Sequence, residues 1–303
     1  MMLWLGRSIV LLLLVSSAET GPARAKDLSL TIQTRDAVTA QKMTSTSTIQ
    51  FPQNEGSRKT SENGFYQKWI VPLTDANDGP FIIDITAPNY LDREITIRAD
   101  AVALTLSKLQ RPLRLALAPK TGQYDYEYIS NGLNFLNDDT DRALVYYEGP
   151  YLQNNWATPD EYGIKLRYDY ARALSDACIN LGYDTCGEAK RLFEAMNADF
   201  SQNQEIYRSS KLNQSLINDA LAALKYNEFK VTVQSLTAPL SRVNVGADSV
   251  GFVEKQFDAA KQQGADLLHD IASDSTGAYA RVGVKLDMVN KDLEYVSSIQ
   301  KAR

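Results

Sequence analysis

Histidine is nearly absent from this chain of 303 residues, because His269 is the only one. A single histidine excludes a metal site built from several histidines, and it leaves a Ser-His-Asp or Cys-His mechanism only one candidate base. His269 lies in a helix-like stretch, where a solvated or helix-capping side chain is expected. The sequence also lacks a glycine-rich phosphate loop, a Gly-x-Ser-x-Gly elbow and a zinc motif. We therefore expect no metal and no cofactor.

Positive charge is not in excess either. The chain has 32 Lys and Arg residues against 37 Asp and Glu residues, which gives a net charge of −5. A mildly acidic chain lacks the electrostatic footprint of a nucleic-acid-binding protein. It also offers no polybasic run for an anionic membrane. We therefore expect no nucleic-acid partner.

Long apolar runs are missing after the first residues of the chain. Arg7 precedes the apolar run 9–15, and Ala23-Arg24-Ala25 follows a few small and polar residues later. This is the anatomy of a secretory signal peptide, and the run is shorter than the about 20 residues of a membrane span. We expect residues 1–25 to be a signal peptide. No cysteine lies near the cleavage site, so we do not expect a lipid anchor. The mature chain is predicted to be exported, periplasmic or secreted, with no membrane span.

Cysteine is scarce, and the two that are present lie close together. Cys178 and Cys186 both fall in the part of the chain that is predicted to be exported. In an oxidising compartment such a pair forms a disulfide, whereas two buried free thiols are the alternative. The spacing is not that of a Cys-x-x-Cys redox motif. We predict a structural disulfide.

The chain divides near residue 119 into a part with strand signals and a part with helix signals. In residues 26–118, apolar and polar residues alternate around Leu30, and short apolar runs follow at 81–85, 95–97 and 102–106. Turn residues separate these runs, which is typical of a β-sandwich or barrel. Residues 53–63 are polar and are predicted to form a long exposed loop. The predicted fold class is α+β by separate domains: an antiparallel β-sandwich at 26–118, then an all-α, solenoid-like domain of helical hairpins at 119–303.

One segment of the first part resembles a known family. Residues 79–90 read Gly-Pro-Phe-Ile-Ile-Asp-Ile-Thr-Ala-Pro-Asn-Tyr, which is similar to the signature turn of the carboxypeptidase-regulatory-like, or transthyretin-like, β-sandwich. Asn89 stands where that family usually has glycine, and asparagine tolerates a positive φ better than other non-glycine residues. The resemblance implies an accessory, non-catalytic module. Another Ig-like sandwich would carry the same implication.

The second part carries one-sided apolar stripes at steps of three and four residues. These stripes predict helices at 161–181, 189–200, 212–226 and 249–272, and a last one with an apolar seam over 282–296. The two cysteines flank the turn between the first two helices, so their disulfide would close a helical hairpin. The seam is too short for a free coiled coil and is expected to pack on the rest of the domain, whereas a partner-binding helix is the alternative.

The hairpins resemble tetratricopeptide-type repeats in part. The positions that approximate the repeat's aromatic, Leu-Gly, aromatic, Ala and aromatic pattern are Tyr128, Asn131, Gly132, Phe135, Ala143 and Tyr147. Asn131 replaces the usual leucine, Ala143 falls one residue early, and no strict 34-residue period runs through the chain. The resemblance therefore implies the class of stacked helical hairpins.

Aromatic residues are concentrated between residues 124 and 170, where nine of the sixteen tyrosines lie. Those that share the helical core period are expected to fill the core, namely Tyr128, Tyr147, Tyr162 and Tyr170. Those that flank helices or sit in loops are candidates for partner binding, because such rings are typical of interfaces and sugar sites. These candidate site residues are Tyr124, Tyr126, Tyr151 and Trp156, with the last two in a predicted loop over 149–156.

Carboxylates gather at Asp138, Asp139 and Asp141. The glycine and the distant glutamate of a calcium loop are missing, so we expect a turn that caps a helix beginning near Asp141. A pair of carboxylates elsewhere in the chain could still serve a glycosidase mechanism.

Three functions stay open at the level of sequence. The first is an exported, non-enzymatic binding or scaffold protein that engages a protein or peptide partner on its helical domain. The second is a cell-envelope protein that binds a glycan through the sandwich or Trp156. The third is a hydrolase that uses carboxylates. The absence of catalytic motifs favours the first.

Overall fold

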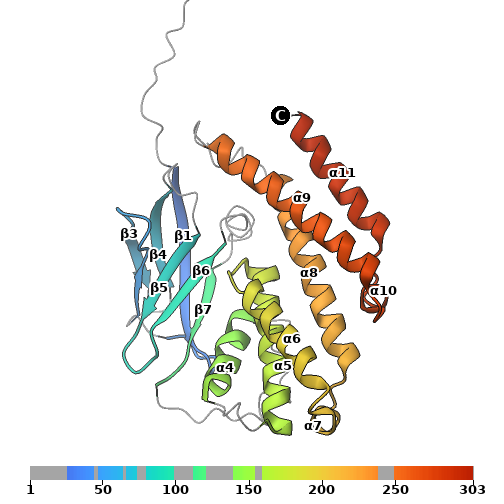
Figure 1. Ribbon diagram of the computed structural model, residues 1–303. Coiled ribbons are helices and arrows are strands. Elements are labelled where there is room, and N and C mark those ends of the chain that lie inside the picture. The colour runs from blue at the N-terminus through green and yellow to red at the C-terminus, as the bar shows by residue number, and fades with distance from the viewer. Residues whose placement is uncertain are drawn as a thin grey trace, which may run out of the picture.

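The residues that the computed structural model describes are 26–43, 47–63, 66–73, 80–98, 112–120, 139–153, 159–237 and 249–302. They form an N-terminal region of sheets and a C-terminal region of helices, in the order that the sequence predicts (Figure 1). The predicted signal peptide and the predicted strand at 102–106 lie outside the described residues.

The strands form two sheets that are rich in antiparallel pairs. One sheet has the order β3-β4-β1-β7 and the other the order β2-β5-β6. The pair β1–β7 is parallel and departs from the all-antiparallel prediction. The strands are β1 Lys26–Asp36, β2 Thr48–Gln50, β3 Arg58–Asn63, β4 Tyr66–Leu73, β5 Phe81–Thr86, β6 Arg93–Ile97 and β7 Leu113–Leu117.

The prediction of a loop over 53–63 is wrong for its second half, because Arg58–Asn63 form the strand β3. All six of its residues are exposed, and it pairs with β4 across a register shift between Lys59 and Ser61. A polar edge strand of this kind has no alternation of apolar and polar residues, so the sequence pattern gave no strand signal. In the turn after β5, Asn89 has a φ of +67°, the conformation that its place in the predicted turn requires.

Helices make up the second region. They are α4 Thr140–Gln153, α5 Glu161–Asp176, a π-helical turn η1 Ala177–Leu181, α6 Cys186–Phe200, α7 Gln204–Ser209, α8 Gln214–Thr237, α9 Ser249–Ser273, α10 Ala278–Arg281 and α11 Leu286–Ala302. The predicted helices at 161–181 and 249–272 are confirmed almost to the residue. The helix predicted over 212–226 is longer, because α8 continues to Thr237.

The apolar seam at the C-terminus is confirmed as a packing surface, with one change at its start. Val289 and Val296 are fully buried, and α11 packs on α9 and α8. Leu286 is exposed, because the chain makes the short helix α10 and a turn before α11 begins. Leu293 packs directly on Gly264 of α9. A Cβ atom added at Gly264 would lie 2.5 Å from the Cδ2 atom of Leu293.

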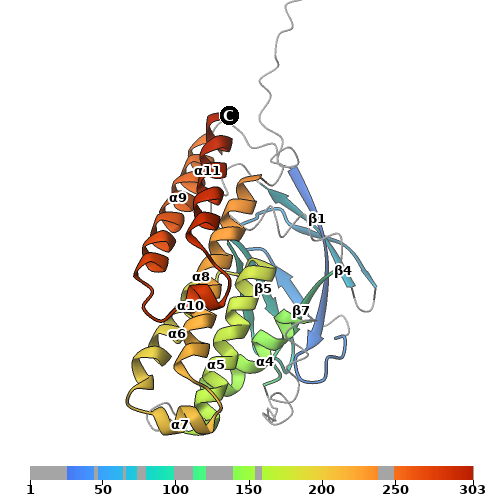
Figure 2. The same cartoon turned by 90° about the vertical axis from the view of Figure 1, so that its right-hand side faces the viewer.

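The described residues form two large apolar cores and a small third cluster of Ala37, Ala116, Ala118 and Val145. The larger core runs without interruption from the inner faces of both sheets into α4, α5 and α6. The other large core lies among α8, α9, α10 and α11. In Figure 2, α4 and α5 lie beside the strands, whereas α9 and α11 form the layer farthest from them. The division at 118/119 stays a prediction, since strands and helices share the larger core.

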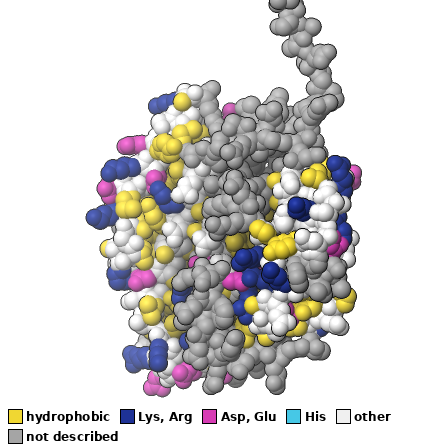
Figure 3. Space-filling model, turned by 180° about the vertical axis from the view of Figure 1, so that it is seen from behind, with side chains coloured by type: hydrophobic (Ala, Val, Ile, Leu, Met, Phe, Trp, Pro, Cys, Tyr) yellow, Lys and Arg dark blue, Asp and Glu magenta, His cyan; other side chains and the backbone are white. Residues whose placement is uncertain are grey.

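Within the described residues, no helix has both the length and the apolar character to cross a membrane. In Figure 3, hydrophobic, basic and acidic side chains are interspersed over the described part of the surface that is seen from behind.

Candidate functional site

A buried carboxylate joins the sheets to the helices. Asp141, in the first turn of α4, accepts hydrogen bonds on both oxygens. Its Oδ1 atom receives Arg93 Nη2 at 2.6 Å and the Tyr183 hydroxyl at 2.8 Å. Its Oδ2 atom receives Arg93 Nη1 at 2.9 Å and the Ala116 amide at 2.6 Å. One side chain therefore connects β6, β7, α4 and the loop before α6.

A second group of charges ties the start of α4 to the end of β1. Arg35 pairs with Asp139, whose carboxylate also accepts from the Arg142 amide at 3.3 Å. The guanidinium of Arg142 donates to the carbonyl oxygens of Ala37 and Val38, both at 2.7 Å. Asp139 thus caps the helix as predicted. Asp138 lies outside the described residues, and Asp141 is a bridging group rather than a cap.

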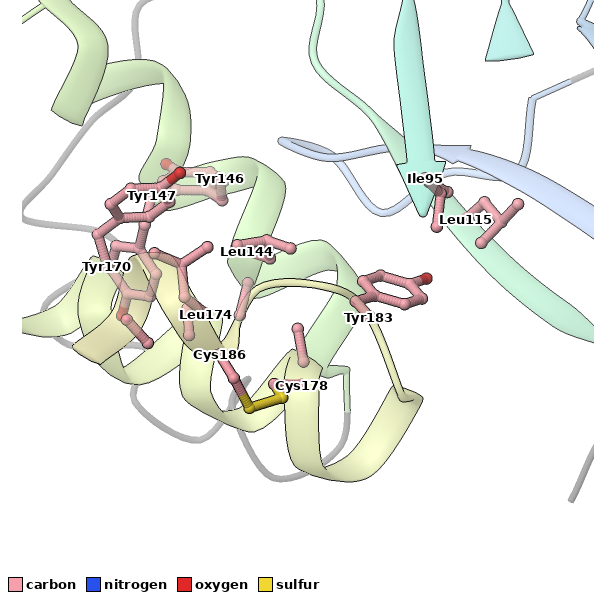
Figure 4. Packing of buried hydrophobic residues seen from close by; sticks show 14 of the residues in the cluster. Ile95, Leu115, Leu144, Tyr146, Tyr147, Tyr170, Leu174, Cys178, Tyr183 and Cys186 are labelled. Carbon is pink, nitrogen blue, oxygen red and sulfur yellow. A yellow bond between two sulfur atoms is a disulfide. The ribbon is translucent and has the colours of Figure 1, made fainter. Parts of the chain in front are cut away.

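The disulfide positions the loop that carries Tyr183. Cys178 and Cys186 are bonded, as predicted, with their Cα atoms 5.4 Å apart. Between them Gly182 takes a φ of +73°, which reverses the chain. Its carbonyl oxygen accepts from the Arg98 amide at 2.9 Å, so the loop lies along the edge of β6. Figure 4 shows Tyr183 reaching from this loop toward Ile95 and Leu115.

These buried ionisable groups have partners within the fold. Four donors occupy the lone pairs of Asp141. Burial raises the pKa of Glu148, which faces Arg93 from two turns further along α4, and the cation partly opposes this. Burial likewise raises the pKa of Asp169, which Lys165 partly offsets. Among the described residues, no group of three or more His, Cys, Asp and Glu side chains is arranged to hold a metal ion.

The predicted site residues fall at one end of the α4–α5 hairpin or outside the described residues. Tyr124, Tyr126 and Trp156 are among the latter. Tyr151 lies in the last turn of α4 rather than in a loop, since the helix continues through Pro150. Its half-buried ring packs on Tyr170 with centroids 4.6 Å apart.

Exposed apolar side chains are present at the same end of this hairpin. Leu152, next to Tyr151, is 70% exposed, and Tyr162 in the first turn of α5 is 39% exposed. The prediction that Tyr162 fills the core is therefore wrong, although this position shares the three-and-four-residue period of the buried residues of α5. Tyr147 and Tyr170 are buried as predicted.

Comparison with protein-family models, curated proteins and solved structures finds no match to this chain. His269 is exposed on α9, in agreement with the solvated side chain that was expected.

Sequence reasoning missed the partners of Asp141. They come from positions 25 to 48 residues away along the chain. One signal could have found Arg93: it alternates with Ile95 and Ile97, which are buried, so the strand period places it on the inner face. A charge at such a position needs a buried partner. The sequence alone does not say which carboxylate supplies it.

Proposed function

We propose that this chain is an exported, non-enzymatic binding protein that engages a protein or peptide partner at the end of its α4–α5 hairpin. The observation that carries the proposal is the exposure of Leu152, which follows Tyr151 in the last turn of α4, and of Tyr162 in the first turn of α5. A large apolar side chain that is 70% exposed gains the most from being covered by a partner.

The charges next to this surface favour a basic partner segment. Asp160 and Glu161 are exposed at the start of α5, beside Tyr162. Asp160 also caps the helix by accepting from the Gly163 amide at 2.6 Å. A peptide with an apolar side chain followed by Lys or Arg would cover Leu152 and Tyr162 and face these carboxylates. We therefore favour a segment of that composition.

The architecture proposed for this role is a β-sandwich followed by stacked helical hairpins. The sandwich is supported by the two sheets, whose inner faces share one core. The hairpin stack is supported by the contacts of α5 with α6, α6 with α8, α8 with α9 and α9 with α11. Export is supported by the leader sequence and by the disulfide.

Affinity capture from an envelope extract tests the proposal. The chain from Lys26 onward is compared with the double variant Leu152→Ser/Tyr162→Ser. A matched control is Leu286→Ser/Tyr295→Ser on α11, because those side chains are 43% and 49% exposed and lie on another part of the molecule. All three proteins are first shown to melt alike.

We expect a protein that the original chain and the control retain and the first variant loses. Equal retention by all three would contradict the proposed surface. Retention of peptidoglycan or polysaccharide in place of a protein would favour the glycan-binding alternative.

A further inference from the structure

The outer face of the four-stranded sheet collects positive charge, although the chain as a whole is acidic. Pairing places Arg114 of β7 beside Gln33 of β1, and Lys68 of β4 beside Thr31. Residues 31, 33 and 35 alternate with the buried core positions of β1, so they point to the opposite face. Arg35 is therefore on the same face as Arg114 and Lys68.

Few carboxylates oppose these cations. Asp139 pairs with Arg35 through Nη2, and Asp141 is occupied by Arg93. Arg114 is exposed and forms no ion pair with any residue of the described strands and helices. Burial lowers the pKa of Arg35, the carboxylates of Asp139 and Asp141 partly oppose this, and repulsion from Arg114 and Arg142 adds to it. The face thus keeps an unneutralised positive charge.

Among the described residues, two buried donors on this face have no acceptor. They are Nε2 of Gln33 and Nε of Arg35. Gln33 is only 3% exposed and Arg35 only 9%. A buried N–H group without an acceptor is destabilising, and such groups mark the place of a missing water or ion. The two donors lie two residues apart on one strand, beside the free guanidinium of Arg114.

We propose that Gln33, Arg35 and Arg114 form a binding site for an oxyanion, the carboxylate or phosphate group of an anionic ligand. Arg114 is at the solvent side of this site and Gln33 is at its floor. Carboxylate and phosphate oxygens accept several hydrogen bonds each, and arginine binds both groups with two parallel donors. The site lies on the sheet, away from the surface proposed for the protein partner, and is independent of it.

Titration with two probes tests the site and identifies the source of the oxyanion. Inorganic phosphate and galacturonate are added separately to the isotope-labelled chain from Lys26 onward. The nuclear magnetic resonance signals of the Gln33 side-chain amide and the Arg35 Nε–H group report binding. The variants are Arg114→Gln and Gln33→Leu, and both should fold, since the first is exposed and the second removes an unpaired buried donor. Arg58→Gln is the matched control, an exposed arginine on the same sheet face but on the edge strand β3.

We expect saturable shifts of both signals with at least one probe. Each of the two variants should weaken binding by about tenfold or more, because a hydrogen bond to a charged group is lost. Arg58→Gln should change it by less than about twofold, because salt screens distant charges. Tighter binding of galacturonate would indicate an acidic glycan, and tighter binding of phosphate would indicate a phosphorylated ligand. No saturable shift with either probe, or equal weakening by Arg58→Gln, would overturn the proposal.

Discussion

Replacing Asp141 by asparagine tests what holds the sheets to the helices. Each carboxylate oxygen accepts two donors: Arg93 Nη2 and Tyr183 on one, and Arg93 Nη1 and Ala116 on the other. In either orientation of the new amide, its nitrogen faces two donors. Arg93 also loses its counter-charge while it stays buried.

The expected cost follows from this loss of pairing. Removing one partner of a buried ion pair destabilises a protein by about 3–5 kcal/mol. For a chain of this size that corresponds to a fall in Tm of roughly 5–9 °C. Unfolding in guanidinium, followed by far-ultraviolet circular dichroism, measures the change.

The matched control is Asp287→Asn on α11. Its carboxylate is mostly exposed and faces Lys291 at 3.9 Å, so the change in the free energy of unfolding should stay within about 0.5 kcal/mol. If Asp141→Asn were no more destabilising than this control, the role given to Asp141 would be refuted.

Three further changes probe other parts of the fold. Reducing the Cys178–Cys186 bond, which spans eight residues, should cost about 2.5 kcal/mol by loop entropy, and unfolding with and without a reductant checks this. Gly264→Ala should lower the free energy of unfolding by about 1–3 kcal/mol, because the new methyl group overpacks the contact with Leu293. Leu293→Ala makes room for that methyl group, so the double variant should lose less stability than the two single variants together. Burial raises the pKa of Glu148, so its contribution to stability is present below the ordinary carboxyl pKa of about 4.3 and is lost as the pH rises through the raised value. Glu148→Gln should therefore gain stability relative to the original chain between pH 4 and pH 7, and a constant difference across that range would contradict the assignment.

Local sequence patterns predicted the elements that bury one face. The stripe from Tyr162 to Leu181 predicted α5 and η1, and the alternation at 81–85 predicted β5, since each pattern needs only near neighbours in sequence. The disulfide was predicted from the short spacing of two cysteines in an exported chain. The edge strand β3 was missed, because its pairing comes from β4 and its side chains are all polar.

The candidate sites could be predicted only in part. The prediction places Tyr151 in a loop over 149–156, yet α4 continues through Pro150 to Gln153. The grouping of Gln33, Arg35 and Arg114 depends on a parallel pairing between segments about eighty residues apart, which no local pattern contains. Composition alone does not reveal such a surface, because folding brings together charged residues from strands that are distant in sequence.

The most direct test of the proposed function is photo-cross-linking from position 152. A photo-reactive amino acid replaces Leu152 in the chain expressed with its leader in its own host, and a second protein carries it at position 286. Both positions are exposed, so both can react with whatever covers them. The account predicts a discrete protein adduct from position 152 that is absent from position 286. No adduct from position 152, or the same adducts from both positions, would contradict it.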